Sequence, residues 1–248
     1  MKISNELSQC VKATFASFTL IAVFSVPLHA RDVPRSDRAA NAAARSVYIE
    51  AVRILDSIQK TKYQHRTAID EKKGEYLCDC SGFVGYVLNR SVGKDGTGAL
   101  GDGRKRPLAM DYEKFFAAAP AKRDRESRWQ RVVRLADARP GDIIAWRHDK
   151  PVPGNTGHVV IVDQRPVLED DGLVRVVVID STTRPQVDDT RPEGTSGVGR
   201  GAMWFTIDEK GRPLGTIRGS RNAEPKVENT SIGRALPVAI KRASRRAA

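Results

Sequence analysis

The second half of the chain is a succession of short apolar, β-branched runs separated by turns that carry Pro and Gly, and this pattern restricts the fold more than any other feature. It predicts strands at residues 131–135, 143–146, 158–162, 173–179, 202–207, 214–218 and 231–236. The first half instead predicts helices at residues 37–60, 81–89 and 110–118. Because the helices precede the strands and do not alternate with them, the sequence predicts an α+β fold rather than a doubly wound sheet.

The first two predicted helices each have one apolar side. The helix at residues 37–60, for which Ser36 is the candidate N-cap, has apolar residues at helical spacing. These residues are Ala44, Val47, Ala51, Ile54, Leu55 and Ile58. The helix at residues 81–89 likewise carries Phe83, Val84, Val87 and Leu88 on one side. We therefore expect both helices to pack against the core.

The first thirty residues have the layout of a secretory signal peptide. Lys2 and Lys12 supply positive charge, an apolar run spans residues 13–26, and P-L-H-A at residues 27–30 ends in a small residue. The run is short for a membrane span, although an uncleaved anchor is the alternative. We therefore predict export to the periplasm or the extracellular space, with a mature chain that begins near Arg31 and has no membrane span.

The 218 residues that follow this segment divide into three predicted parts. Residues 31–60 are predicted to form a linker and an N-terminal packing helix. Residues 61–236 form one domain, which is long enough to bury a sizeable core. Residues 237–248 form a basic tail that is predicted to be disordered. The sequence does not predict the oligomeric state.

The chain is strongly basic. Its formal charge is +12, or +11 without the first thirty residues, which carry two Lys and one Glu. Such a surface suits an anionic polymer. We find no nucleic-acid motif and no basic helix interleaved with aromatic residues, so a nucleic-acid partner is not predicted. The letters G-T-G-A-L-G at residues 96–101 match a dinucleotide fingerprint, but no strand precedes them, so no cofactor is predicted.

The cysteines carry the first chemical signal. Beyond Cys10 in the signal segment, the chain has only Cys78 and Cys80. A disulfide between cysteines one residue apart would be strained, so the predicted exported protein has no disulfide framework. A Cys-x-Cys metal site would need a second Cys/His pair at ligand spacing, and the sequence has none, so no metal is predicted.

The segment C-D-C-S-G-F-V at residues 78–84 puts Cys80 where a loop turns into an apolar helix. With Asp79 or Ser81 as the cap, the helix dipole and the unpaired N–H groups would favour a thiolate and could bind an oxyanion. A buried structural cysteine is the alternative reading. Cys78 could be a packing residue or a redox partner, and we expect packing.

His158 is the candidate base for Cys80. It opens the apolar run at residues 158–162 after Gly157, and the next predicted strand ends at Asp180. If these strands form a hairpin symmetric about Glu169, His158 lies directly opposite Asp180 and their side chains share a face. A carboxylate there would fix the imidazole tautomer.

Other residues compete for these roles. By strand parity, the rival carboxylate Asp163 points away from His158. His148 is expected in an exposed loop, and His65 has no assigned role. Trp146 and Trp204 could line a sugar-binding groove, with core packing as the alternative.

Three motifs resemble those of the NlpC-type cell-wall cysteine peptidases. They are D-C-S-G-F-V at residues 79–84, R-P-G-D-I-I-A-W at residues 139–146 and G-H-V-V-I-V at residues 157–162. The resemblance covers roughly residues 60–185 and implies a papain-like α+β fold. It implies Cys80 as nucleophile, His158 as base and Asp180 as the third member. The family usually has Tyr-Gly-Gly before the nucleophile, whereas here Gln-His-Arg follows Tyr63, and its third residue is usually His, Asn or Gln.

The resemblance implies an exported hydrolase that cuts amide bonds in peptidoglycan stem peptides, with peptidoglycan or muropeptides as partners. Two alternatives remain open. The first is an N-acetylmuramoyl-alanine amidase, or another thiol acyl-transfer enzyme using the same site. The second is a non-catalytic module that binds the cell wall through its basic surface.

Overall fold

The fold is mixed α+β, with helices first and a mostly antiparallel sheet after them, as the sequence predicts. The computed structural model describes residues 38–93, 97, 100, 106–124 and 126–237. The predictions for the signal segment, for Ser36 as a helix cap, for nearly all of the basic tail and for most of the glycine-rich motif at residues 96–101 lie outside the described residues. Within the described part, no helix is both long and apolar enough to span a membrane.

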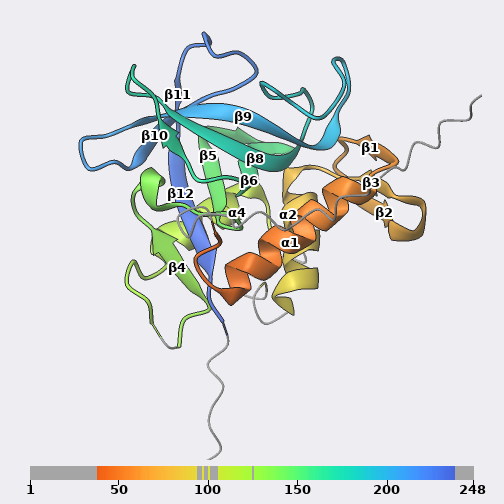
Figure 1. Cartoon of the computed structure of the whole chain (residues 1–248), viewed down its shortest axis with the longest axis horizontal. Coiled ribbons are helices and arrows are strands. Elements are labelled where there is room, and N and C mark those ends of the chain that lie inside the picture. Colours follow the sequence, from red (N-terminus) through yellow and green to blue (C-terminus); the bar gives the residue numbers. More distant parts are fainter. Residues whose placement is uncertain (1–37, 94–96, 98–99, 101–105, 125, 238–248) are drawn as a thin grey trace, which may run out of the picture. The chain divides into compact units, whose positions relative to one another are not determined.

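The second half of the chain forms a nine-stranded sheet (Figure 1). Its strands are β4 (Trp129–Val132), β5 (Ile143–Val152), β6 (Asn155–Val162), β7 (Val167–Leu168), β8 (Val174–Thr182), β9 (Gly197–Ile207), β10 (Pro213–Ile217), β11 (Lys226–Val227) and β12 (Asn229–Ala235). They run in the order β11-β10-β9-β8-β6-β5-β12-β4, and β7 pairs with β8. All seven predicted strands are present, with bounds that differ by a few residues.

Strand β5 is the largest difference from these predictions. It was expected to stop at Trp146 but continues to Val152, where a hairpin leads into β6. The polar residues 147–150 and the following Pro concealed this extension in the sequence. The extension stays paired with β6 at Arg147, opposite Gly157, and again at Val152, opposite Asn155, with an irregular register between these two points.

Helix α1 (Ala42–Ser57) begins later than predicted. Its N-cap is Asn41, whose side-chain oxygen accepts hydrogen bonds from the N–H groups of Ala43 and Ala44 at 2.8 and 3.0 Å. The predicted apolar side is confirmed, since Ala44, Val47, Ala51 and Ile54 are fully buried.

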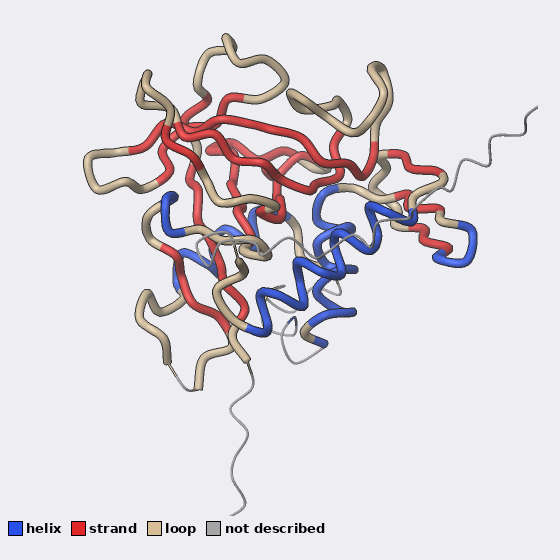
Figure 2. The backbone as a smooth tube through the Cα atoms, in the orientation of Figure 1, coloured by secondary structure: helices blue, strands red, loops and turns tan. Residues whose placement is uncertain are grey.

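Helix α2 (Cys80–Ser91) begins at the cysteine. Asp79 is the N-cap and accepts a hydrogen bond from the Gly82 N–H at 2.7 Å. The predicted apolar side, Phe83, Val84, Val87 and Leu88, is fully buried. Helix α1 packs against α2, and α2 packs against β6 and β8. Figure 2 shows the helices gathered on one side of the large sheet, where α4 (Ala109–Ala118) completes the layer.

A small sheet leads the chain into α2. Residues 61–77, predicted to be irregular, instead contain β2 (Ala68–Asp70), β3 (Glu75–Leu77) and most of β1 (Lys60–Lys62), in the order β1-β3-β2. Strands of three residues are too short to show a periodic pattern, so they could not be predicted from the sequence. The β1–β3 pair positions the residues that lead into α2, since the Cys78 N–H donates to the Lys62 carbonyl at 3.1 Å.

Both faces of the large sheet are buried, and this explains why β6 reads as a continuous apolar run. Alternate residues face the helices, among them Ala145, Val159 and Ile161. The others form a second core that includes Ile144, Trp146, Val160, Val162, Val178, Met203, Phe205 and Val132. Because this second core joins β4 to β9, which lie far apart in the strand order, the sheet must curl upon itself.

Candidate active site

Cys80 is the first residue of α2, and its side chain is only 5 % exposed. The backbone N–H groups of Val159 and Ser81 lie against its sulfur and stabilise the thiolate. Val159 directly follows His158 in β6. The fold therefore brings the thiol of α2 against the residue that follows the candidate base in the middle of β6.

The Cys80 thiol is not activated in the way that its position at the helix start suggests. Burial raises its pKa to about 12, and the negative charge of Asp79 adds to this effect. The N–H groups of Val159 and Ser81 lower the pKa, as does Arg218, but they do not outweigh burial. The N–H groups thus favour the thiolate in the expected direction, but burial outweighs them, and Cys80 is a neutral thiol in the resting protein.

His158 lies in β6 with its side chain buried, and its Nε2 is 2.8 Å from Asp180 Oδ2. A carboxylate only accepts hydrogen bonds, so Nε2 must carry the proton and Nδ1 is left as the basic nitrogen. Burial lowers the pKa of His158, and Arg218 lowers it further, against the raising effect of Asp180. The resting imidazole is therefore neutral.

Asp180 shares a face with His158, as predicted, but the register differs. Ile161 pairs with Ile179, so the hairpin is centred on Asp170 rather than Glu169. Continued to the start of β6, this register sets Thr182 opposite His158 and places Asp180 on the diagonal. The side chains still meet because a diagonal neighbour on the same face lies within reach of a long side chain.

Asp180 is held by two residues that the sequence did not single out. Arg191 Nη2 donates to Oδ1 at 2.9 Å, and Gln186 Nε2 donates to Oδ2 at 2.9 Å. Burial alone would raise the pKa of Asp180, but the charge of Arg191 and the hydrogen bond with His158 hold it well below its usual range. Arg191 also pairs with Asp189 at 2.5 Å, and all three charged groups are buried. The orienting carboxylate is therefore ionised and fixed in place.

Arg191 should matter for stability more than any surface arginine. Arg191→Met leaves Asp180 and Asp189 buried without a counter-charge, so we expect the free energy of unfolding at neutral pH to fall by about 3–5 kcal/mol. The folded pKa of Asp180 lies below its unfolded value of about 3.9, so its contribution is present above that pH and is lost as the pH falls further. Urea unfolding at a series of pH values measures both effects.

Arg175→Met is the matched control for this substitution. Arg175 pairs at 3.1 Å with Asp188, whose side chain is 72 % exposed. Its removal should cost less than about 1 kcal/mol. Equal losses for the two variants would mean that the buried cluster does not hold the fold together.

Three residues surround the entrance to α2. Arg106 makes a two-pronged ion pair with Asp79, at 2.5 and 2.9 Å, and His65 Nδ1 lies 3.3 Å from the same carboxylate. Tyr63 is half-buried beside them, and burial raises the pKa of its hydroxyl, with a further contribution from the neighbouring Cys80 and Asp79 side chains. Arg106 carried no signal in the sequence, because it reaches Asp79 from a loop 27 residues away.

Cys78 is a packing residue, as expected. It is fully buried, and burial raises the pKa of its thiol to about 12. The Ser181 hydroxyl donates to its carbonyl oxygen at 2.6 Å, which ties the lead-in of α2 to the end of β8. Cys78 and Cys80 are both free thiols.

The remaining candidates do not take the predicted roles. Asp163 pairs with Arg200 at 3.1 Å rather than with His158. Trp146 and Trp204 are buried, at 0 and 5 % exposure, which agrees with core packing. The expectation for His148 is wrong: it lies in β5, largely covered, with Glu228 as its partner. In the described part of the chain, no group of three or more His, Cys, Asp or Glu side chains is placed to hold a metal ion.

The comparisons with known proteins add no relative. No protein-family model, no curated protein and no solved structure matches the chain. Any assignment of function therefore depends on the motifs in the sequence and on the geometry of Cys80, His158 and Asp180.

Because Cys80 and His158 are both neutral in the resting protein, we expect an unusual pH dependence for the alkylation of Cys80. In a Cys78→Ser background, the rate at which iodoacetamide alkylates Cys80 should be low at neutral pH. It should still be rising above pH ~9, where an ordinary thiol is already mostly ionised, because the pKa of Cys80 is raised. Mass spectrometry of the alkylated peptide measures the rate. A rate that is constant between about pH 5 and 8 would instead indicate a preformed thiolate–imidazolium pair.

Proposed function

We propose that the protein is an exported papain-like thiol hydrolase that cleaves amide bonds in peptidoglycan stem peptides. Cys80 is the nucleophile, His158 the base and Asp180 the residue that orients the imidazole. One observation carries the proposal: the sulfur of Cys80 lies against the N–H of Val159, the residue that follows His158 in β6, and Nε2 of this histidine lies 2.8 Å from Asp180 Oδ2. A thiol, an imidazole and an orienting carboxylate are the parts that acyl transfer requires.

The neutral pair sets the order of events. Nδ1 of His158 takes the proton from Sγ of Cys80 as the sulfur attacks the carbonyl carbon, so thiolate formation and attack occur together. N–H groups at the start of α2 stabilise the oxyanion. When the carbon–nitrogen bond breaks, the imidazolium returns its proton to the leaving amine and a thioester remains on Cys80. Water, deprotonated by His158, then releases the acid and restores the thiol.

Peptidoglycan as the substrate is supported by the sequence. The three motifs that resemble NlpC-type peptidases include Cys80 and His158, and the fold orders them as helix start, strand and next strand. The strongly basic chain suits a polymer that carries carboxylates.

Digestion of purified muropeptides tests the proposal. Wild-type protein should release peptide fragments with a new amino terminus and leave the sugar chain untouched, whereas Cys80→Ala should release none. Release of whole stem peptides from the sugar would favour the amidase alternative. Binding to intact wall with no cleavage would favour the binding module.

Export is part of the same proposal, and it is carried by the apolar run at residues 13–26. Intact-protein mass spectrometry of the periplasmic or extracellular fraction should find a chain that begins near Arg31. A chain with Met1 retained would contradict both the cleavage and the cell-wall setting.

A further inference from the structure

Arg218 brings a positive charge to the candidate site. It directly follows β10, and its guanidinium carbon lies 5.4 Å from the centre of the Trp146 ring. The same tryptophan ring contacts the His158 ring at a centroid distance of 5.1 Å. Arg218 Nη2 donates to Thr182 Oγ1 at 3.3 Å, two residues beyond Asp180 in β8. The Arg218 guanidinium therefore contacts β5 through Trp146 and β8 through Thr182. The Trp146 ring contacts both this guanidinium and the His158 imidazole.

The charge of Arg218 has no carboxylate partner within the described part of the chain. Its Nε is buried and makes no hydrogen bond to any described residue. Two other arginines near the site differ, since Arg106 pairs with Asp79 and Arg191 with Asp180. A guanidinium without a counter-charge favours an arriving anion, which would supply a charge partner and hydrogen-bond acceptors for its terminal N–H groups.

The position of Arg218 also lets its charge act on the reacting groups. It lowers the pKa of Cys80 and of His158, so its field extends to both side chains. An anion bound to the guanidinium would therefore lie close to the Trp146 ring that contacts His158, within the range at which its charge acts on both reacting groups. A guanidinium presents a planar fork of donors that matches a carboxylate and binds it in two-pronged fashion.

We propose that Arg218 forms a carboxylate-binding subsite beside Cys80, so that the enzyme selects substrates with a free carboxylate close to the bond it cuts. This inference rests on the proposed function in one respect only, the identity of the substrate. The subsite itself depends on the placement of Arg218 and can be tested without a peptidoglycan substrate.

Two reagents of nearly the same size provide the test. Iodoacetate and iodoacetamide both alkylate a thiol by displacement of iodide. Iodoacetate carries a carboxylate where iodoacetamide carries an uncharged amide. We expect the ratio of their rates at Cys80, in a Cys78→Ser background at about pH 9, to exceed the ratio for N-acetylcysteine by about tenfold, the value of one charge-assisted hydrogen bond. Arg218→Met should return the ratio to that of N-acetylcysteine. Any change in the pKa of Cys80 affects both reagents alike and cancels.

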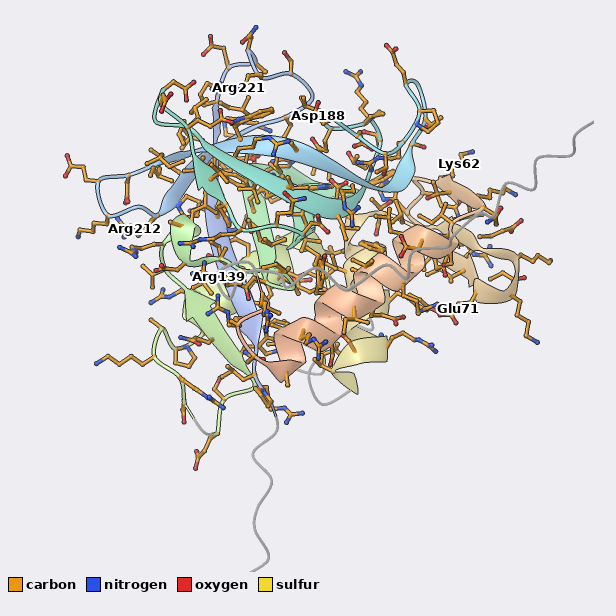
Figure 3. All side chains as sticks on the ribbon, in the orientation of Figure 1. Lys62, Glu71, Arg139, Asp188, Arg212 and Arg221 are labelled. Carbon is orange, nitrogen blue, oxygen red and sulfur yellow. The ribbon has the colours of Figure 1, made fainter. Side chains whose placement is uncertain are left out.

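Arg221→Met is the matched control. Arg221 also lies over a tryptophan, 5.2 Å from the centre of Trp204, but it pairs with Glu169 and Asp171. Figure 3 shows it at the side of the large sheet away from α1 and α2. The substitution removes the same charge from the chain and should leave the ratio unchanged. Arg218→Lys keeps the charge and loses the planar set of donors, so it should keep part of the preference for iodoacetate. Comparison with this variant shows whether a loss of the preference in Arg218→Met results from misfolding.

The outcomes separate the subsite from the proposed function. An elevated ratio that Arg218→Met abolishes supports the subsite, even if muropeptides are not cut. A ratio equal to that of N-acetylcysteine, or one that Arg218→Met leaves unchanged, overturns the subsite, even if muropeptides are cut. If neither reagent reaches Cys80, both proposals fall. Where muropeptides are cut, those with a free carboxylate should react about tenfold faster than amidated ones in the wild type and equally fast in Arg218→Met.

Discussion

Cys80→Ala should abolish muropeptide hydrolysis, with a loss of about 10⁴-fold or more, because no other group replaces a covalent nucleophile. The free energy of unfolding should change by about 1 kcal/mol, since the substitution removes one small, buried atom group. Rates from muropeptide digestion and stability from urea unfolding measure both quantities.

Cys78→Ala is the matched control for the nucleophile. It makes the same substitution two residues earlier, at a thiol that is more deeply buried and lies in front of the helix. We expect most of the activity to remain. A folded but inactive Cys78→Ala together with an active Cys80→Ala would reverse the assignment.

His158→Ala should lower the rate by about 10³-fold, within the range that general-base catalysis supplies. The raised pKa of Cys80 makes this residue essential, since the thiol is neutral at rest and cannot attack until Nδ1 accepts its proton. Addition of Cys80→Ala to this variant should cost far less than the loss it causes in the wild type, because the two side chains act as a unit.

Asp180→Asn should cost less activity than His158→Ala. Its side-chain oxygen can still accept the Nε2 proton of His158, while the charge that stabilises the imidazolium is lost. Arg191 keeps Asp189 as a partner in this variant, so the fold should survive. A rate for Asp180→Asn below that for His158→Ala would mean that Asp180 does more than orient the imidazole.

The sequence predicted those parts of the structure that depend on local pattern. Helical spacing located the buried side of α1 and α2, and the period of two placed His158 and Asp180 on one face. The centre of the hairpin was wrong by one residue, because the polar loop between β6 and β8 offers several turns of similar quality. The contact between His158 and Asp180 survives this error. The face of the sheet on which a side chain lies can therefore be predicted more reliably than the residue that it pairs with.

The electrostatics of the site could not be predicted in the same way. The helix start implied a lowered pKa for Cys80, but burial decides the outcome, and burial follows from the packing of α2 against β6 and β8. Arg191 and Gln186 reach Asp180 from a loop with no periodic pattern. The role of Arg106 depends in the same way on a contact between distant segments.

Covalent catalysis by Cys80 is tested by trapping the acyl-enzyme. Wild-type protein is mixed with a muropeptide, quenched in acid during turnover and digested for mass spectrometry. We expect a peptide in which the acyl fragment of the substrate is joined to Cys80 as a thioester, and no such adduct in Cys80→Ala. Turnover of the muropeptide with no adduct on Cys80, or with its rate retained in Cys80→Ala, would contradict covalent catalysis by Cys80.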